Sequence, residues 1–344
     1  MEDIISQLPT WVLEYKLLIV FATAVLISSL LIPQIIRFSL KNGWVDVPDV
    51  RKIHIRSIPN LGGIAIFLGL FFASIFWYRY FKNTDFIFIT IGVLILFFTG
   101  IFDDIKGMKA RRKLIFQIIA SFVAVAGGIR ITSFQGFLGI EELNIVTQYI
   151  FSMIVIVGVI NAYNLIDGID GLAGGIGVIN LSVIGYVFYS MDHTSFALIS
   201  FAGAGSLLGF LIYNFHPARI FMGDTGAMTL GFLTVILGIK AIELNTITYT
   251  HTYLSQHMLL FISSIMFLPV FDTLRVFTIR ILHRKSPFTP GKDHLHHVLL
   301  QLGLKPVQVT VLLYTLNVLV ILMGFLINYI KPLNLFVSTM FFNI

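Results

Sequence analysis

The amino-acid sequence predicts an all-α polytopic integral membrane protein with about ten transmembrane helices. Hydrophobic residues make up 57% of the 344-residue chain and charged residues only 12%, whereas soluble domains carry about a quarter charged residues. So much apolar surface cannot be buried in one soluble core. The apolar residues also occur in long stretches, and a helix needs roughly 20 such residues to cross a bilayer.

Ten apolar stretches are long enough to be interpreted as spans, and they occur along the whole chain. The expected spans are residues 13–36, 61–81, 86–102, 114–129, 145–163, 172–190, 196–213, 226–243, 257–280 and 308–329. The final stretch LNLFVSTMFFNI adds an eleventh span if it also crosses the membrane.

The loops between the spans divide the basic residues unequally. Loops 37–60, 103–113, 161–172, 214–225 and 275–305 contain 17 of the 23 Lys and Arg residues. Loops rich in Lys and Arg remain in the cytoplasm, so these five are expected there. Both termini of a chain with ten spans then lie outside. The clusters of Asp, Asn and His occur in the same five loops.

Two adjacent carboxylates end the third span. Asp103 and Asp104 occur in the segment GIFDDIKGMKARRK. Neighbouring helix positions point about 100° apart, so one carboxylate can face a cleft while neighbours or a metal hold the other. Ionisable groups at a span are costly and are usually functional. Arg111 and Arg112 are better explained as anchors at the membrane surface.

The segment NAYNLIDGIDGLAGG carries four oxygen-bearing side chains at the end of the fifth span. Asn161, Asn164, Asp167 and Asp170 recur every three residues, which places them along one helix face. The glycines predict an interrupted helix and a backbone that approaches a ligand closely. Amide and carboxylate oxygens suit Mg²⁺ or Mn²⁺ rather than zinc. The alternative is a polar loop with a capping Asp, which explains one of the four residues.

The segment YNFHPARIFMGDTGAM places Asp224 directly before the eighth span. A helix N-terminus offers free N–H groups to phosphate, and a carboxylate can add a metal ion. Phe221 is an aromatic side chain in a polar loop and can stack on a base. An ordinary helix cap explains Asp224 equally well on this segment alone.

A histidine cluster follows in the segment SPFTPGKDHLHHVLLQLG. His294, His296 and His297 come just after Lys292 and Asp293. Their spacing does not match the zinc motif H-E-x-x-H, and the chain contains no cysteine that could bind zinc or form a disulfide. Binding of an anion, or donation of a proton to phosphate oxygens, suits this cluster better.

Two further features have structural explanations. The first loop is basic and includes His54, and attraction to anionic lipid headgroups explains its charge. Its functional interpretation is that it receives an anionic lipid. Asp272 lies in the ninth span near Arg275, and an ion pair between them is the favoured interpretation.

Hard oxygen ligands, glycines, basic residues and histidines on one membrane face together indicate phosphate and Mg²⁺ chemistry at the boundary of lipid and cytosol. An ion-coupled transporter also carries Asp and Asn in its helices, but near the middle of the bilayer. A non-catalytic lipid-binding protein explains the basic loops and leaves the Asp–Asn cluster unexplained. Nucleic acid is not an expected partner.

Five segments, in this order, resemble the polyprenyl-phosphate N-acetylhexosamine-1-phosphate transferases. They are RKIHIRSIPNLGG, FDDIKGMKARRKLIFQ, NAYNLIDGIDGLAGG, NFHPARIFMGDTG and SPFTPGKDHLHH. The HLHH form is similar to the branch that uses undecaprenyl phosphate and GlcNAc-1-phosphate, of the glycosyltransferase 4 type. The phospho-N-acetylmuramoyl-pentapeptide transferases of peptidoglycan synthesis, with a different histidine run, are the alternative.

The resemblance implies one membrane-embedded transferase domain, residues 1–344, in the bacterial cytoplasmic (inner) membrane. Its implied reaction moves an N-acetylhexosamine 1-phosphate, by default GlcNAc-1-phosphate, from a UDP-sugar to undecaprenyl phosphate and releases UMP. This reaction initiates the synthesis of a cell-envelope polysaccharide. The resemblance also implies Mg²⁺ as the cofactor, with Mn²⁺ as a substitute, and a homodimer.

The resemblance further implies residue roles by motif position. The metal-linked residues would be Asp224 and Asn164, and Asp103 and Asp104 would lie near the attacking phosphate. The other implied catalytic or substrate-binding residues are Asp167, Asp170, His294, His296, His297, Lys113, Asn161, Asn214, Phe221, Lys292 and His54. Lys292 stands where the family has an arginine. A lysine keeps the positive charge but cannot make the bidentate contact of an arginine. Direct in-line attack and a covalent aspartyl-phosphate intermediate both remain open.

Overall fold

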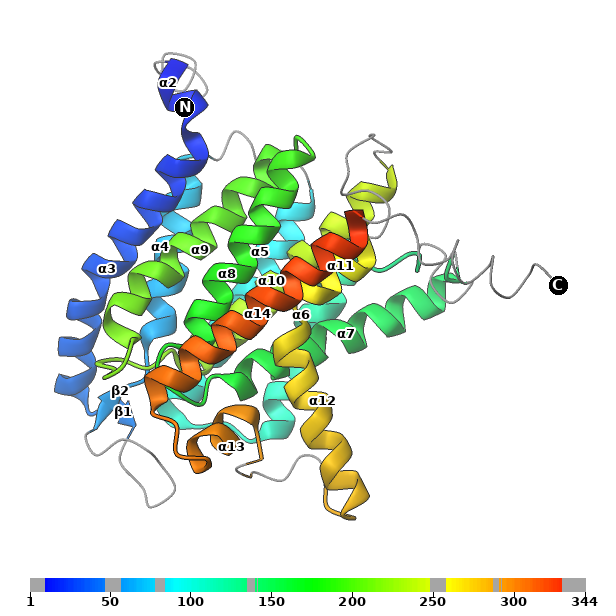
Figure 1. The fold of residues 1–344 in the computed structure, drawn as a ribbon. Coiled ribbons are helices and arrows are strands. Elements are labelled where there is room, and N and C mark those ends of the chain that lie inside the picture. Colours follow the sequence, from blue (N-terminus) through cyan, green and yellow to red (C-terminus); the bar gives the residue numbers. More distant parts are fainter. Residues whose placement is uncertain are drawn as a thin grey trace.

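The computed structural model describes residues 10–46, 57–77, 84–134, 140, 142–247, 258–286, 291 and 293–329. Helices account for about four fifths of these residues (Figure 1), which confirms the all-α expectation. The helices are α2 (Thr10–Glu14), α3 (Lys16–Asn42), α4 (Gly62–Ile75), α5 (Asp85–Lys106), α6 (Ala110–Ala126), α7 (Ile145–Ile166), α8 (Leu172–Ser190), α9 (Thr194–Asn214), α10 (Gly223–Ile247), α11 (Met258–Ile265), α12 (Phe267–Leu282), α13 (Leu295–Gln301) and α14 (Pro306–Tyr329).

The chain is a multi-pass membrane protein. Seven helices, α3, α5, α7, α8, α9, α10 and α14, are long and apolar enough to cross a bilayer. Helices α11 and α12 meet at a bend of 73° and supply an eighth span if they cross together. The two other expected spans coincide with α4 and α6, which have 14 and 17 residues. The expected eleventh span lies outside the described residues.

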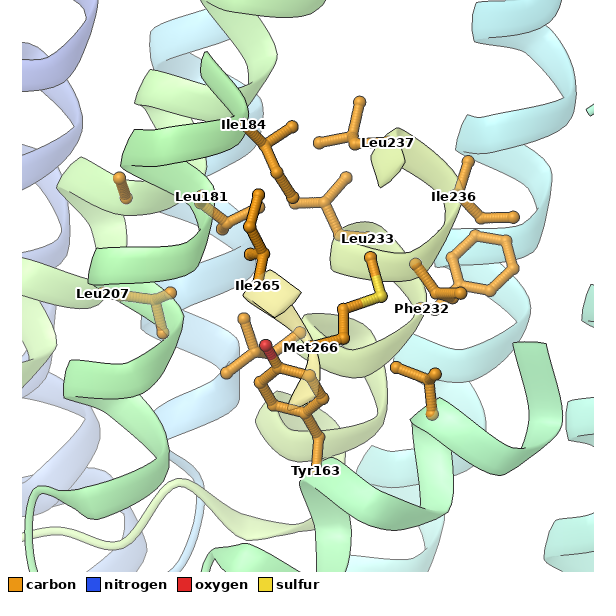
Figure 2. Packing of buried hydrophobic residues seen from close by; sticks show 14 of the residues in the cluster. Tyr163, Leu181, Ile184, Leu207, Phe232, Leu233, Ile236, Leu237, Ile265 and Met266 are labelled. Atoms are coloured by element: carbon orange, nitrogen blue, oxygen red, sulfur yellow. The ribbon is translucent and has the colours of Figure 1, made fainter. Parts of the chain in front are cut away.

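Helix α10 occupies the middle of the bundle and contacts α4, α5, α7, α8 and α11. Apolar side chains make this packing, since Leu181 and Ile184 of α8 lie against α10 residues such as Leu233 and Leu237 (Figure 2). Met266, at the bend between α11 and α12, lies in the same cluster. This packing fixes the direction of α10, and with it the position of the Asp224 end.

Glycines let two neighbouring helices approach the first turn of α10. A Cβ atom on Gly63 of α4 would lie 2.2 Å from the backbone nitrogen of Gly226. A Cβ atom on Gly100 of α5 would lie 2.3 Å from the Cα of Thr225. Both distances are far below van der Waals contact, so only glycine fits at either position. The carboxyl-terminal turn of α5 is thereby held beside the first turn of α10.

Two short strands, which the sequence analysis did not predict, form before α4. Strands β1 (Val45–Asp46) and β2 (Ile58–Pro59) pair in antiparallel fashion. The backbone then continues in register with the segment before α10, because the Phe221 nitrogen donates to the Pro59 oxygen at 2.7 Å and the Gly62 nitrogen to the Phe221 oxygen at 2.9 Å. The strands and α13 lie at the same end of the bundle (Figure 1).

Candidate active site

Three carboxylates converge where α5 ends and α10 begins. One oxygen from each of Asp103, Asp104 and Asp224 lies within 4.8 Å of the other two. Lys113, in the first turn of α6, places its Nζ 2.6 Å from Asp103 Oδ2 and also donates to Asp224 Oδ2. Burial alone would lower the pKa of Lys113, but the adjacent Asp224 and Asp103 raise it above its usual range. The lysine therefore stays charged and offsets the repulsion between the carboxylates.

Asp104 caps α10. Its carboxylate accepts hydrogen bonds from the Asp224 nitrogen at 2.8 Å, the Thr225 nitrogen at 3.0 Å and the Thr225 hydroxyl at 2.5 Å. A carboxylate at this point satisfies free N–H groups and complements the helix dipole. The cap of α10 therefore comes from α5, and the Asp224 carboxylate is left to contact Lys113 and Asn164.

Gly223 makes this arrangement possible. Its φ is +69°, and a Cβ atom there would lie 2.0 Å from the Asn60 oxygen and 2.6 Å from Asp104 Oδ2. Asn60 in turn donates to the Asp104 backbone oxygen at 3.1 Å. The positive φ and the close approach both require glycine.

The polar segment after α7 breaks the helix, as its glycines predicted. Helix α7 ends at Ile166, and Gly171 has a left-handed φ of 78° before α8 begins. Asn164 donates to Asp224 Oδ1 at 3.1 Å. Asn161, one turn deeper, instead donates to Gln117 Oε1 of α6 at 2.8 Å. Of these two amides, only Asn164 contacts the carboxylates.

The turn 167–171 is held by side chains from two other helices. Asn214 of α9 accepts from the Gly171 nitrogen at 2.9 Å and donates to the Ile220 oxygen at 2.9 Å. From α14, the Thr310 hydroxyl donates to the Asp170 oxygen at 3.1 Å and the Tyr314 hydroxyl to the Gly171 oxygen at 2.5 Å. The sequence analysis missed both α14 residues; the signal available was a pair of hydroxyls four residues apart in an apolar span.

Asp167 and Asp170 have different environments within this turn. The Asp170 carboxylate lies 2.7 Å from His216 Nδ1 and accepts from the Ala218 nitrogen at 3.0 Å. Burial raises the pKa of Asp167 to about 7, and the negative charges of Asp224, Asp104 and Asp170 act in the same direction. Asp167 therefore exchanges its proton near neutral pH.

A cavity of about 920 Å³ lies beside Asp104, Asn164, Asp224 and the turn that begins at Asp167. Such a volume accommodates a ligand of nucleotide size. Its polar lining includes Asn60, Asp104, Asn164, Asp167, Asp170, Asn214, His216, Asp224 and His297. Phe221 also lines the cavity, at the position where the sequence analysis expected a stacking surface.

The histidine cluster divides between the cavity and the protein interior. His297 lines the cavity. His296 is 1% exposed and packs against Gly168, and among the described residues neither of its ring nitrogens has a hydrogen-bond partner. Burial, together with the neighbouring His297 and His294, lowers the pKa of His296 to about 3. His294 is also buried and contacts Asp272. Lys292 and His54 lie outside the described residues.

The site has the donors that a hard divalent cation requires. Lys113 already places a positive charge between the oxygens of Asp103 and Asp224, so the electrostatic environment there favours a cation. Carboxylate and amide oxygens suit Mg²⁺. The carboxylates of Asp103 and Asp224 therefore fit the expected metal. Asn164, which was expected as a ligand with Asp224, presents its amide nitrogen to Asp224.

The bundle and its carboxylate-lined cavity define a multi-pass membrane protein with a site suited to phosphate chemistry. Residues 86–242 match the sequence profile of Glycosyl transferase family 4. The chain is also 34% identical over 317 residues to a probable undecaprenyl-phosphate N-acetylglucosaminyl 1-phosphate transferase of Bacillus subtilis, an alignment that covers 91% of this chain and 83% of the relative. The chain belongs to this family of phosphosugar transferases.

Two further relatives are similar over most of their length. A decaprenyl-phosphate N-acetylglucosaminephosphotransferase of Mycobacterium tuberculosis is 30% identical over 320 residues, which are 87% of this chain and 79% of the relative. An undecaprenyl-phosphate alpha-N-acetylglucosaminyl 1-phosphate transferase of Salmonella typhi is 29% identical over 283 residues, 80% of this chain and 74% of the relative.

Proposed function

We propose that this protein transfers N-acetylglucosamine 1-phosphate from UDP-N-acetylglucosamine to undecaprenyl phosphate and releases UMP, as the first step of a cell-envelope polysaccharide. The names of the relatives support this branch over the peptidoglycan branch. The observation that carries the proposal is the group formed by Asp103, Lys113, Asn164 and Asp224, of which Asn164 and Asp224 line a cavity of nucleotide size.

Bond changes in the proposed reaction are simple. An oxygen of the acceptor phosphate attacks the sugar-linked phosphorus of the donor, and the bond from that phosphorus to the oxygen of UMP breaks. Such transfers depend mainly on positioning and charge neutralisation. Asp103 would orient the acceptor or take its last proton, and Lys113 would neutralise the charge that gathers on the phosphates. A covalent intermediate on an aspartate is the competing mechanism.

Asp224 is the proposed Mg²⁺ ligand, with Asn164 and Asp103 beside it, and the ion would supply charge neutralisation at the diphosphate. Phe221 would stack on uracil at the cavity wall. Asp167, Asp170 and Asn214 would shape the nucleotide pocket. The Asn214 side chain would do so by holding the backbone of Gly171 and Ile220. His297 would contact the diphosphate or the sugar.

The proposed setting is the bacterial inner membrane, with the cavity open to the cytoplasm. The excess of Lys and Arg in the loops that build the site supports this orientation. Ten spans with both termini outside are consistent with it, because each expected span coincides with a helix or with the bent pair. A homodimer is proposed from the family resemblance.

Release of UMP tests this function directly. Purified protein is incubated with undecaprenyl phosphate, Mg²⁺ and UDP-N-acetylglucosamine, and UMP is measured for the wild type, Asp224→Asn and Asp192→Asn. Asp192 follows α8 at the end away from Leu172 and the site, so its variant is the matched control. We expect lipid-dependent UMP release that falls at least 100-fold only in Asp224→Asn. Failure of every UDP-sugar to yield UMP from folded, lipid-binding protein would overturn the proposal.

A further inference from the structure

Asp272 of α12 is a buried carboxylate outside the Asp103–Asp224 group. It is 2% exposed, and three groups donate to it. His294 Nδ1 lies 2.8 Å from Oδ2, and Oδ1 accepts from Arg275 at 2.9 Å and from the Leu295 nitrogen at 2.9 Å. The expected Asp272–Arg275 ion pair is thus present, and two contacts to the histidine cluster accompany it.

These contacts fix the start of α13. The helix has seven residues, and its N-cap residue His294 makes no side-chain capping bond. A helix this short is unstable alone, so its first N–H group is satisfied from α12, by Asp272. Arg275 strengthens the connection because it also donates to the Asp293 backbone oxygen. The segment that carries the histidines is therefore tied to α12.

The imidazole of His294 is oriented by the same carboxylate. A carboxylate is an acceptor only, so Nδ1 carries the hydrogen and Nε2 carries the ring's lone pair. The His294 and His296 rings lie parallel, with centroids 5.9 Å apart, and the His296 and His297 centroids are 4.2 Å apart. A row of rings thus leads from Asp272 to His297 at the cavity.

The row also contacts the turn after α7. A Cβ atom on Gly168 would lie 2.2 Å from His296 Nε2, so the imidazole lies directly on this backbone. Helix α12 packs against α7 as well, and α7 carries Asn164. The position of Asp272 therefore sets the histidines relative to the carboxylate group from two directions.

Stability alone does not account for a carboxylate here. Well-packed apolar residues commonly replace a buried ion pair without loss of stability, and a charge is costly in a helix that spans a membrane. We infer that Asp272 is a positioning residue, which orients His294 and the first turn of α13 so that His297 meets the substrate in the cavity. This inference rests on the proposed function.

Asp272→Asn tests the inference, because the amide keeps the size of the side chain and places a donor against the His294 Nδ1 hydrogen. We expect kcat for UMP release to fall about 100-fold, measured at a temperature where the variant is folded, while the donor KM changes less than threefold. Thr278→Val is the control on the same helix, since this exposed hydroxyl donates to the Leu274 oxygen of α12 itself at 2.9 Å. Its kcat should stay within twofold of the wild type.

A double variant separates orientation from folding. If Asp272 acts through His294, Asp272→Asn adds less than threefold to the loss caused by His294→Gln, whereas independent effects would multiply. Multiplying losses, a loss of kcat explained by unfolding at the assay temperature, or equal losses at Asp272 and Thr278 would each overturn the inference.

Hydrogen exchange distinguishes this failure from failure of the proposed function. If the wild type releases no UMP from any donor, the proposed function fails, and exchange at the amides of Leu295–Gln301 is then the readout. Faster exchange in Asp272→Asn than in Thr278→Val would still support positioning, and equal exchange would overturn it.

Discussion

The carboxylates of the site look alike in sequence and differ in what they contact. Asp104 is occupied by two N–H groups and a hydroxyl at the start of α10, whereas Asp103 and Asp224 share the ammonium of Lys113. Asp103 and Asp104 are adjacent, so the 100° between neighbouring helix positions sends one to a cap and the other to the cation. The sequence predicted this division of directions but not which residue took which direction.

Asp167 is predicted to destabilise the protein as the pH rises. Its pKa is raised from 3.8 to about 7, so the folded state holds a proton that the unfolded state has lost. The resulting cost begins above pH 4 and grows by about 1.4 kcal/mol per pH unit until about pH 7. Asp167→Asn should therefore have a Tm several degrees above the wild type at pH 8, in EDTA, and near it at pH 4.5. Equal Tm differences at both pH values would contradict the prediction.

His296 is predicted to have the opposite dependence. Its pKa is lowered from 6.5 to about 3, so its contribution to stability is complete above pH 6.5 and is lost as the pH falls toward 3. Between pH 7.5 and 5 the wild type should lose more Tm than His296→Gln does. His283 is the control, because it is an exposed histidine bonded to the Ile279 oxygen of its own helix. His283→Gln should keep the wild-type slope.

Residue spacing identified Asn164 and missed the true environment of Asn161. Both lie on α7 one turn apart, yet Gln117 of α6 takes the amide of Asn161. Which helix faces a given turn is a long-range contact, and spacing within one segment does not record it. The same reason hid Tyr314, whose hydroxyl bonds to Gly171 from 143 residues away.

At the scale of elements, α14 acts as a brace for the turn 167–171. Its residues Thr310 and Tyr314 are one helical turn apart and donate to successive carbonyl oxygens of that turn. Asn317 continues the same face and donates to Asn180 of α8 at 2.8 Å. A span outside the matched family region therefore holds the backbone of the site.

Tyr314→Phe is predicted to loosen this brace without disturbing the apolar packing of the ring. Loss of the hydrogen bond should cost about 1 kcal/mol in stability and lower kcat for UMP release about tenfold, because Asp167 and Asp170 sit on the released turn. The neighbouring Thr315 bonds to the Val311 oxygen of its own helix, so Thr315→Val removes a hydroxyl without touching the turn. Comparable loss of kcat in both variants would refute the bracing role.

The length of the apolar stretches in the sequence predicted the long helices. Seven of the ten expected stretches are helices long and apolar enough to cross a bilayer, where lipid leaves the backbone no other partner than itself. The other three correspond to the shorter helices α4 and α6 and to the bent pair α11 and α12. The 73° bend between α11 and α12 and the strands β1 and β2 were not predicted. Their geometry depends on packing against α10 and on the backbone contacts of Phe221, which involve segments far apart in the sequence.

At the scale of the whole molecule, the site is the place where separate parts of the bundle meet. Helices α5, α6, α7 and α10 each contribute one member of the group Asp103, Lys113, Asn164 and Asp224. Lys113 contacts both Asp103 and Asp224, and Asn164 contacts Asp224. The charge balance of the group is therefore coupled to the packing of the four helices. Removing the charge of Lys113 should therefore lower the global stability of the protein.

Lys113→Gln is predicted to make the stability of the whole protein dependent on Mg²⁺. Without the ammonium, Asp103 and Asp224 face each other uncompensated. Because these side chains are half-buried and partly screened by solvent, the expected cost is about 1–2 kcal/mol, below that of a fully buried pair. In EDTA the variant should unfold several degrees below the wild type. A cation that binds only the folded state adds about 2.7 kcal/mol at a concentration 100 times its Kd, so Mg²⁺ should restore most of the lost Tm.

The same Mg²⁺ titration should raise the wild-type Tm less, because Lys113 already occupies the position between the two carboxylates. Lys109→Gln is the control, since this exposed lysine immediately precedes α6 and lies outside the carboxylate group. Its Tm should respond to Mg²⁺ as the wild type does, and Na⁺ at equal ionic strength should restore neither variant. A Lys113→Gln protein that gains no more from Mg²⁺ than the wild type would show that Asp103 and Asp224 do not form the cation site.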